Sequence, residues 1–116
     1  MKSNSDCFLY ADKQEVDVLE EGIKRQILGY DNEIMMVKVW FDDGCIGYIH
    51  NHRHSQTTYI ESGEFDVNID GKINRLKAGD SFYIPPHVPH GAECKKSGVL
   101  IDVFSPVRED FLKGEQ

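Results

Sequence analysis

Short runs of β-branched and aromatic residues, separated by turn signals, make up most of the chain after Gly29. Apolar and polar residues alternate over 64–70, which predicts a half-buried strand, and Asp70-Gly71 is a strong hairpin signal. The other runs predict strands over residues 34–41, 45–50, 72–76, 81–84 and 99–104. Eight to ten short strands at this spacing predict an all-β sandwich or barrel.

Helix signals are nearly absent except at the end of the chain. Ser105 is a candidate cap for a short C-terminal helix that has Pro106 at its first position and continues over 107–112. The polar, acidic residues 1–30 predict an N-terminal arm with a possible edge strand. We expect a single domain overall, with the barrel over 31–116.

Composition excludes several classes of function. The chain of 116 residues carries 13 Lys and Arg against 20 Asp and Glu, and this net charge of −7 disfavours nucleic acid as a partner. No apolar run has the length of a membrane span, and the first residues contain no apolar signal-peptide core, so we expect a cytoplasmic protein that contacts no membrane. Three widely spaced cysteines, an odd number, predict reduced thiols rather than a disulfide framework.

Histidines at alternate positions suggest a metal site. Residues 50, 52 and 54 can share one face of a strand, and neighbours two apart lie roughly 7 Å apart at Cα. Imidazoles of His50 and His52 could therefore converge on one ion. His54 is near the limit of reach and is expected either behind the ligands or at the pocket rim. Gln56 could supply a further ligand if the chain turns, as could His90 after its proline-rich loop.

A solvated strand face is the alternative interpretation of this histidine run. Ile46 and Tyr48 have the same parity as the histidines, so the face becomes apolar just before them. A pocket with a metal at its mouth would show this pattern. Tyr48 and Trp40 are expected in the core, and His87 on the surface. Nothing in the sequence suggests an activated thiolate at Cys45 or Cys94.

Two glycine- and histidine-containing segments together resemble the two motifs of the cupin family and cover about half the chain. The residues that carry the resemblance are Gly44, His50, Asn51, His52, Gln56 and Gly63 in the first, and Gly79, Pro85 and His90 in the second. Cys94 and His87 depart from the asparagine and glycine common in the second motif. The resemblance implies a cupin jelly-roll barrel (a double-stranded β-helix).

Gln56, at a position where most cupins carry glutamate, and the segment 102–111 narrow the resemblance to the KdgF-type cupins of pectin and alginate degradation. That resemblance implies conversion of 4,5-unsaturated uronates, released by polysaccharide lyases, to linear 4-deoxy-5-keto-uronates. It implies one divalent metal (nickel, zinc, iron or manganese) held by His50, His52, Gln56 and His90. It also implies that Asp102 and Arg108 act on the substrate, with Phe104 and Gln56 contacting it.

The residues themselves leave alternatives open. Asp102 shares an inward face with Leu100 and Phe104, and it could serve as a pocket acid/base or pair with Arg108. Arg108 could clamp a carboxylate or be a solvated residue of a surface helix. A sugar isomerase, an iron dioxygenase and a non-catalytic sugar-binding cupin are the other functions considered. The apolar face of Val99, Ile101 and Val103 predicts a homodimer.

Overall fold

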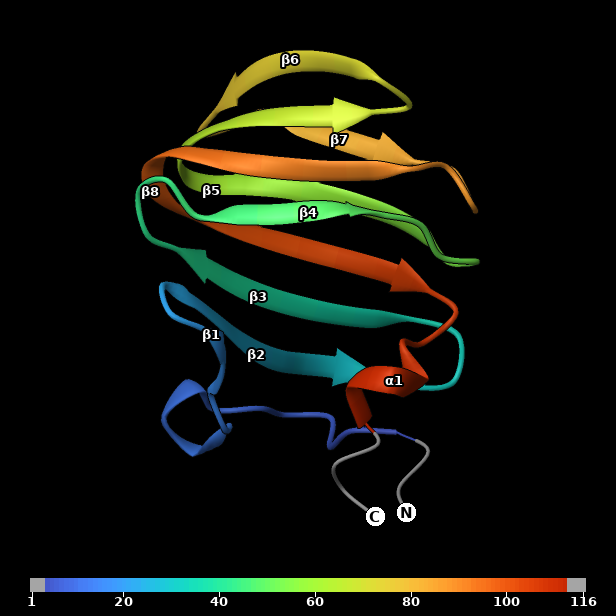
Figure 1. The fold of residues 1–116 in the computed structure, drawn as a ribbon. Helices are drawn as coiled ribbons and strands as arrows, with labels where there is room; N and C mark the ends of the chain where they lie inside the picture. The colour runs from blue at the N-terminus through green and yellow to red at the C-terminus, as the bar shows by residue number, and fades with distance from the viewer. Residues whose placement is uncertain (1–3, 113–116) are drawn as a thin grey trace.

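Antiparallel strands form almost all of the regular structure in the computed structural model, which describes residues 4–112. Every strand pair is antiparallel, in the order β1-β2-β3-β8-β5-β6, with β4 paired to β8 and β7 paired to β5 (Figure 1). The strands are β1 (Asp17–Glu20), β2 (Ile23–Tyr30), β3 (Met35–Phe41), β4 (Ile46–His50), β5 (Ser55–Ile69), β6 (Lys72–Lys77), β7 (Ser81–Ile84) and β8 (His90–Ser105). This is the all-β barrel that the sequence predicts.

Two long strands hold the barrel together. β5 and β8 pair along nearly their whole length, from Ser55 opposite Ser105 to Ile69 opposite His90. Their register shifts near Gly63, which has φ of 85°, and a Cβ there would lie 2.5 Å from the carbonyl oxygen of Lys96. Only glycine allows the two backbones to approach this closely with a left-handed conformation.

Residues 17–30 form two strands, where the sequence predicted at most one edge strand. β2 pairs with β3 from Ile23 opposite Phe41 to Tyr30 opposite Met35, so it is part of the barrel wall. A short 3-10 turn, η1 (Ala11–Lys13), precedes β1 and contains no buried residue. The predicted boundary at residue 31, between an N-terminal arm and the barrel domain, remains a prediction.

The C-terminal helix is present, but its predicted start is wrong. α1 (Glu109–Leu112) begins after residue 107, because Val107 is bound to the barrel: its N–H donates to the carbonyl oxygen of Asn32 at 3.2 Å. No helix within residues 4–112 is long and apolar enough to cross a membrane.

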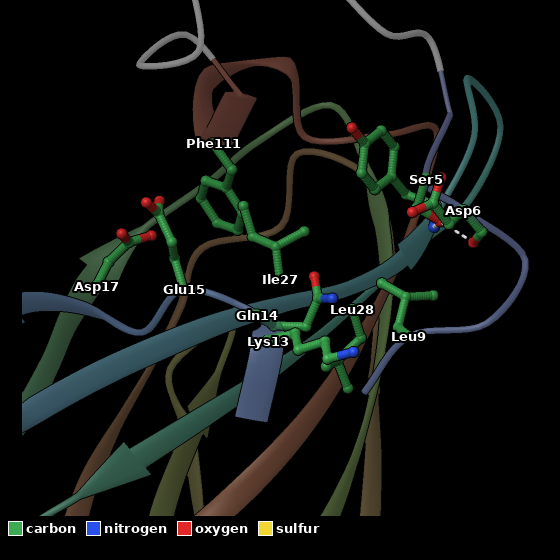
Figure 2. A pocket seen from close by; sticks show the side chains of 11 residues that line it. Ser5, Asp6, Leu9, Lys13, Gln14, Glu15, Asp17, Ile27, Leu28 and Phe111 are labelled. Atoms are coloured by element: carbon green, nitrogen blue, oxygen red, sulfur yellow. Dashed lines mark hydrogen bonds between the residues drawn. The ribbon is translucent and has the colours of Figure 1, made fainter. Parts of the chain in front are cut away.

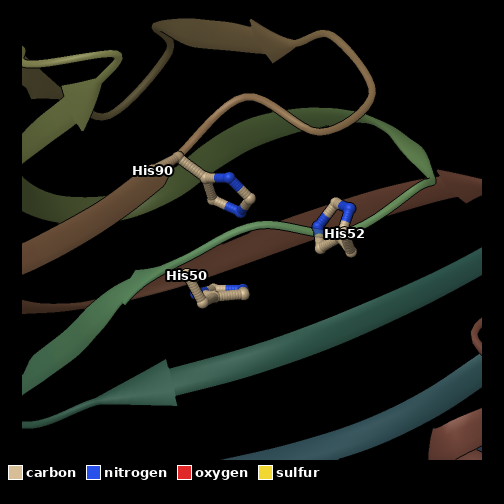
Figure 3. A group of neighbouring side chains, drawn as sticks. All are labelled: His50, His52 and His90. Atoms are coloured by element: carbon tan, nitrogen blue, oxygen red, sulfur yellow. The ribbon is translucent and has the colours of Figure 1, made fainter.

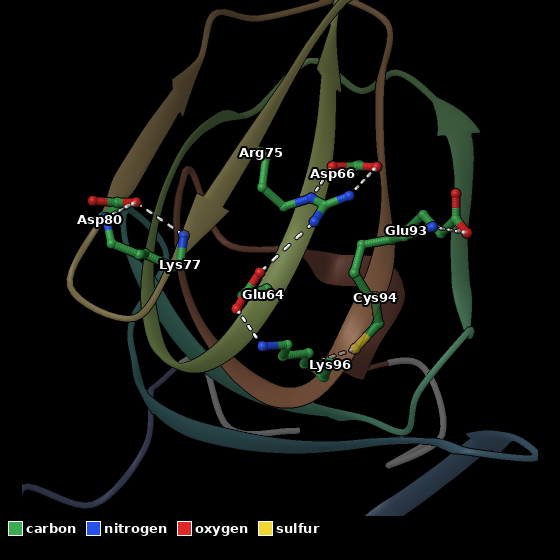
Figure 4. Close-up of polar contacts among 9 residues, drawn as sticks. Glu64, Asp66, Arg75, Lys77, Asp80, Glu93, Cys94 and Lys96 are labelled. Carbon is green, nitrogen blue, oxygen red and sulfur yellow. Dashed lines mark hydrogen bonds and ion pairs between the residues drawn. The ribbon is translucent and has the colours of Figure 1, made fainter.

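Inward-facing side chains of β3, β5 and β8 form the core, and charged pairs lie on the outer face of β5 and β6. Met35, Val37, Ile60 and Phe65 are completely buried. On the outer face of β5 and β6, Arg75 pairs with Asp66 and with Glu64 (Figure 4). Exposed pairs of this kind contribute little stability, so burial of the apolar inner face dominates the stability of the barrel.

Candidate metal centre and pocket

The strand register brings three histidines together. His50 at the end of β4 lies directly opposite His90 at the start of β8, and His52 follows two residues after β4. One imidazole nitrogen from each lies within 4.8 Å of the others, and the three rings face a common space (Figure 3). The His50 and His90 ring centroids are 4.4 Å apart. The histidines predicted to converge from two distant segments do so.

Backbone carbonyl groups fix the orientation of all three rings. Each Nδ1 lies at hydrogen-bonding distance from a main-chain oxygen, which leaves Nε2 as the available ligand atom. These oxygens belong to Tyr48 for His50 (2.9 Å), His54 for His52 (3.1 Å) and Val88 for His90 (2.9 Å). Such support of the second ring nitrogen is typical of metal-binding histidines.

Gln56 completes this cluster from β5. Its Oε1 lies 3.1 Å from Nε2 of His52, while its Nε2 donates to Oγ1 of Thr58 at 3.0 Å. A neutral imidazole has one N–H, so His52 cannot donate both to the carbonyl oxygen of His54 and to Gln56. A cation between Nε2 and Oε1 would remove this conflict, and two donor atoms 3.1 Å apart are spaced to share one ion.

The electrostatics of the cluster favour metal binding. Burial lowers the pKa of His90 to about 4 and also lowers the pKa of His52. Both imidazoles are therefore neutral at pH 7, which is the form that ligates a metal. Imidazole and amide ligands suit zinc, nickel, iron or manganese, so the donor set fits a divalent transition metal without selecting one.

Asp102 lies next to this cluster, on the inner face of β8. It is directly opposite Thr58 of β5, whose hydroxyl donates to its Oδ1 at 2.6 Å, and Nε2 of Gln56 donates to the same oxygen at 3.4 Å. Burial raises the pKa of Asp102 to about 6, because desolvation outweighs these two donors and the nearby positive charge of Arg108. The carboxyl group can therefore exchange a proton near neutral pH.

Arg108 lies beside the pocket rather than in solvent. Only 12% of its side chain is exposed, and its guanidinium stacks on Phe111 at 4.2 Å and on Phe104 at 5.0 Å from the ring centroids. Asp110 accepts two hydrogen bonds from it, at Nε (3.1 Å) and Nη2 (2.9 Å). The ion-pair partner of Arg108 is therefore Asp110, while Asp102 is bound by Thr58 and Gln56.

A cavity of about 300 Å³ connects these groups. Its polar lining includes His50, Gln56, His90, Asp102 and Arg108, with Phe104 among the apolar walls. The volume is at the lower end of the range for small-molecule sites, which suits a ligand of monosaccharide size.

Arg25 of β2 also lines the cavity, with only 16% of its side chain exposed, and the sequence pattern did not single it out. The signal was available, because Arg25 shares the parity of Ile23 and Ile27 and so replaces an apolar residue on an inward face.

A second cavity, of about 440 Å³, lies between the N-terminal arm and β2 (Figure 2). The carboxylates of Asp6, Glu15 and Asp17 line it, with Lys13 as the lining cation. This acidic lining would repel an anionic ligand, and none of the predicted site residues belongs to it.

The remaining candidates have structural positions. His54 is buried, and its Nε2 lies 3.1 Å from the carbonyl oxygen of Val107, so it fastens the C-terminal segment to the barrel. The prediction that Tyr48 belongs to the core is wrong: it is 71% exposed, because β4 lies at the mouth of the cavity. Trp40 is half-buried, and His87 is exposed as expected. Burial raises the pKa of Cys94 to about 11, which keeps this thiol protonated.

Known proteins resemble this chain along most of its length. The family model Cupin_2, described as a cupin domain, matches residues 39–104. The pectin degradation protein KdgF of Dickeya dadantii (strain 3937) is 42% identical over 103 residues, which cover 87% of this chain and 94% of that protein.

Solved structures agree with this relationship. An RmlC-like cupin from Shewanella frigidimarina NCIMB 400 superposes with a TM-score of 0.92 at 54% identity, over 95% of this chain and 99% of the other. KdgF from Halomonas sp. superposes with a TM-score of 0.87 at 36% identity, over 92% of this chain and 99% of the other. Oxalate decarboxylase of Bacillus subtilis, at 22% identity and a TM-score of 0.74 over 82% of this chain and 28% of that one, shares the fold.

Proposed function

The chain belongs to the cupin family and is related to KdgF within it, and from this premise we propose that it is a metal-dependent uronate ketonase. Its substrate would be a 4,5-unsaturated uronate released by a pectin or alginate lyase, and its product the linear 4-deoxy-5-keto-uronate. The observation that carries the proposal is the position of Asp102. This desolvated carboxyl group, with a pKa of about 6, lines a cavity of monosaccharide size. The side-chain amide of Gln56 connects it to His52 of the histidine cluster.

His50, His52, Gln56 and His90 would hold the metal. When bound, a divalent cation in this neutral ligand set supplies positive charge beside a substrate oxygen that becomes negative during the reaction. Gln56 also orients Asp102 through its side-chain amide and can contact the substrate, because it lines the cavity.

Asp102 would carry the proton. As a carboxylate it would take the proton of the C1 hydroxyl, so that C1 becomes the aldehyde and the C1–O5 bond breaks. The enolate left at C5 would then take up a proton at C4 and become the C5 ketone. No atom is gained or lost overall, because the proton lost from the hydroxyl equals the proton gained by carbon. A group with a pKa near the working pH performs both transfers well.

The other lining residues would position the sugar. Asp110 occupies Nε and Nη2 of Arg108, so the remaining N–H groups of this guanidinium can bind the uronate carboxylate. Phe104 would form the wall against which the ring lies, as its burial and its contact with Arg108 indicate.

The test of this proposal is loss of the conjugated double-bond absorbance of unsaturated galacturonate and unsaturated mannuronate, corrected for spontaneous conversion. We expect the purified protein to accelerate at least one of them, and removal of the metal with a chelator to abolish the acceleration. A protein that binds a uronate without converting it would instead be a sugar-binding cupin.

A further inference from the structure

Arg25, on β2, lines the same cavity as Asp102, His50 and His90. Its side chain is 16% exposed and its guanidinium stacks on Phe111, 4.0 Å from the ring centroid. Arg108 stacks on the same ring at 4.2 Å. Their Cζ atoms are therefore no more than about 8 Å apart, and because both side chains line the same cavity, one small anion there can contact both.

Protein groups compensate the charge of Arg25 only in part. Its carboxylate partner, Asp17, is 45% exposed and lies 3.7 Å away, and its buried Nε–H has no acceptor among the described residues. Burial lowers the pKa of Arg25 more than the carboxylates of Asp17 and Asp110 raise it, and the neighbouring charge of Arg108 lowers it further. Asp110 offsets part of the repulsion between the two cations, but it is bound to Nε and Nη2 of Arg108, so a further anion that joins both guanidinium groups would stabilise the pair.

The acidic residues of the cavity explain why two arginines are needed. Asp102 and Glu20 line the same space and would repel an anionic ligand. A single guanidinium that already donates twice to Asp110 leaves little positive charge to offset them. Arg25 supplies a second cation, and its guanidinium group has no such bidentate partner among the described residues.

We propose that Arg25 and Arg108 form a two-arginine clamp for one carboxylate, and that Arg25 makes the site selective for acidic over neutral sugars. Each carboxylate oxygen accepts from one guanidinium, at the short distances typical of charge-assisted hydrogen bonds. The identity of the ligand as an unsaturated uronate rests on the proposed function, whereas the carboxylate clamp rests on the geometry of the two arginines. Arg25 is thus a substrate-binding and specificity-determining residue.

Two measurements on the purified protein test the clamp: steady-state kinetics with unsaturated galacturonate, and calorimetric binding of D-galacturonate and D-galactose. Arg25→Gln should raise KM and weaken galacturonate binding at least about tenfold, the scale of a lost charge-assisted hydrogen bond. Its kcat, its metal content and its affinity for galactose should stay close to wild type. Arg75→Gln is the matched control, since Arg75 is half exposed on β6 and pairs with Asp66 (Figure 4), and neither residue lines the cavity.

The outcomes separate the clamp from the proposed function. If wild type converts no uronate but binds galacturonate in a way that depends on Arg25, the ketonase proposal fails and the clamp stands. If Arg25→Gln has the KM and the galacturonate affinity of wild type, or if wild type binds galacturonate no better than galactose, the clamp is refuted. Should Arg25→Gln fail to fold, Arg25→Lys is the deciding variant, because lysine keeps the charge but lacks the planar guanidinium group. Wild-type affinity for galacturonate in this variant would refute the clamp.

Discussion

Nε2 of Gln56 donates to Oδ1 of Asp102 across 3.4 Å, which links the candidate metal ligands to the candidate proton carrier. The same side chain presents Oε1 to His52 at 3.1 Å, so its two ends face a ligand and an acid. An amide donates to Asp102 and presents an oxygen to His52 at once, whereas an ionised carboxylate at this position would oppose the negative charge of ionised Asp102. The structure thus gives a physical reason for glutamine at position 56.

Gln56→Glu should therefore retain the metal but lose activity. A glutamate can still ligate, but its charge would raise the pKa of Asp102 further and cancel part of the positive charge in the site. We expect turnover of unsaturated galacturonate to fall at least about a hundredfold, the scale of general acid/base catalysis, with metal content unchanged by elemental analysis. Wild-type turnover in this variant would show that the amide is not required.

Metal content should depend on the histidines of the cluster and on no other histidine. His52→Ala and His90→Ala each remove an imidazole that is supported by a carbonyl group, and metal measured by elemental analysis should fall below about a tenth of wild type. His87→Ala is the control, since its side chain is exposed. Retention of wild-type metal by both cluster variants would mean that the ligand set is wrong.

Asp102→Asn should stabilise the metal-free protein at pH 7. The folded pKa of about 6 lies above the ordinary value of 3.8, so ionisation opposes folding as pH rises through this range. This difference of about two pKa units corresponds to roughly 2–3 kcal/mol in the free energy of unfolding at pH 7. Urea unfolding should show the variant more stable at pH 7 and equal to wild type below about pH 3, where Asp102 is protonated in both the folded and the unfolded state. A variant less stable than wild type at both pH values would contradict the desolvated carboxylate.

The outer face of β3, β5 and β8 remains the predicted dimer surface. Met36 and Tyr59 are 41% and 51% exposed on it, beside half-buried Ile101 and Val103. Exposed apolar groups gathered in this way are typical of an interface. Analytical ultracentrifugation at micromolar concentration should give a dimer, and Ile101→Lys a monomer; a wild-type monomer would exclude this surface as a stable interface.

Local patterns in the sequence predicted much of the fold and the clustering of three histidines. Runs of β-branched and aromatic residues between turn signals located β3, β4, β6 and β7 within one residue at each end. The spacing of His50 and His52, with His90 from the second motif, predicted a cluster that the β4–β8 register brings together. These features depend on residues near one another in sequence or on a motif with fixed spacing.

Polar residues inside the barrel limited the rest of the prediction. The first half of β5 was missed because its inward side chains include Gln56 and Thr58, which are polar yet buried at the site. Arg25 was missed for the same reason, and the pairing of Arg108 with Asp110 depends on where the last turn of the chain lies. Sequence patterns fail where function places polar groups in the interior.

Turnover of unsaturated galacturonate by wild type, compared with Asp102→Asn, tests the central claim most directly. Loss of the conjugated absorbance should be much faster with wild type than in buffer, and Asp102→Asn should be slower than wild type by at least about a hundredfold with the same fold and metal content. Equal rates for wild type and Asp102→Asn would remove Asp102 as the proton carrier. A wild-type rate no faster than spontaneous conversion, on galacturonate- and mannuronate-derived substrates alike, would contradict the proposed function itself.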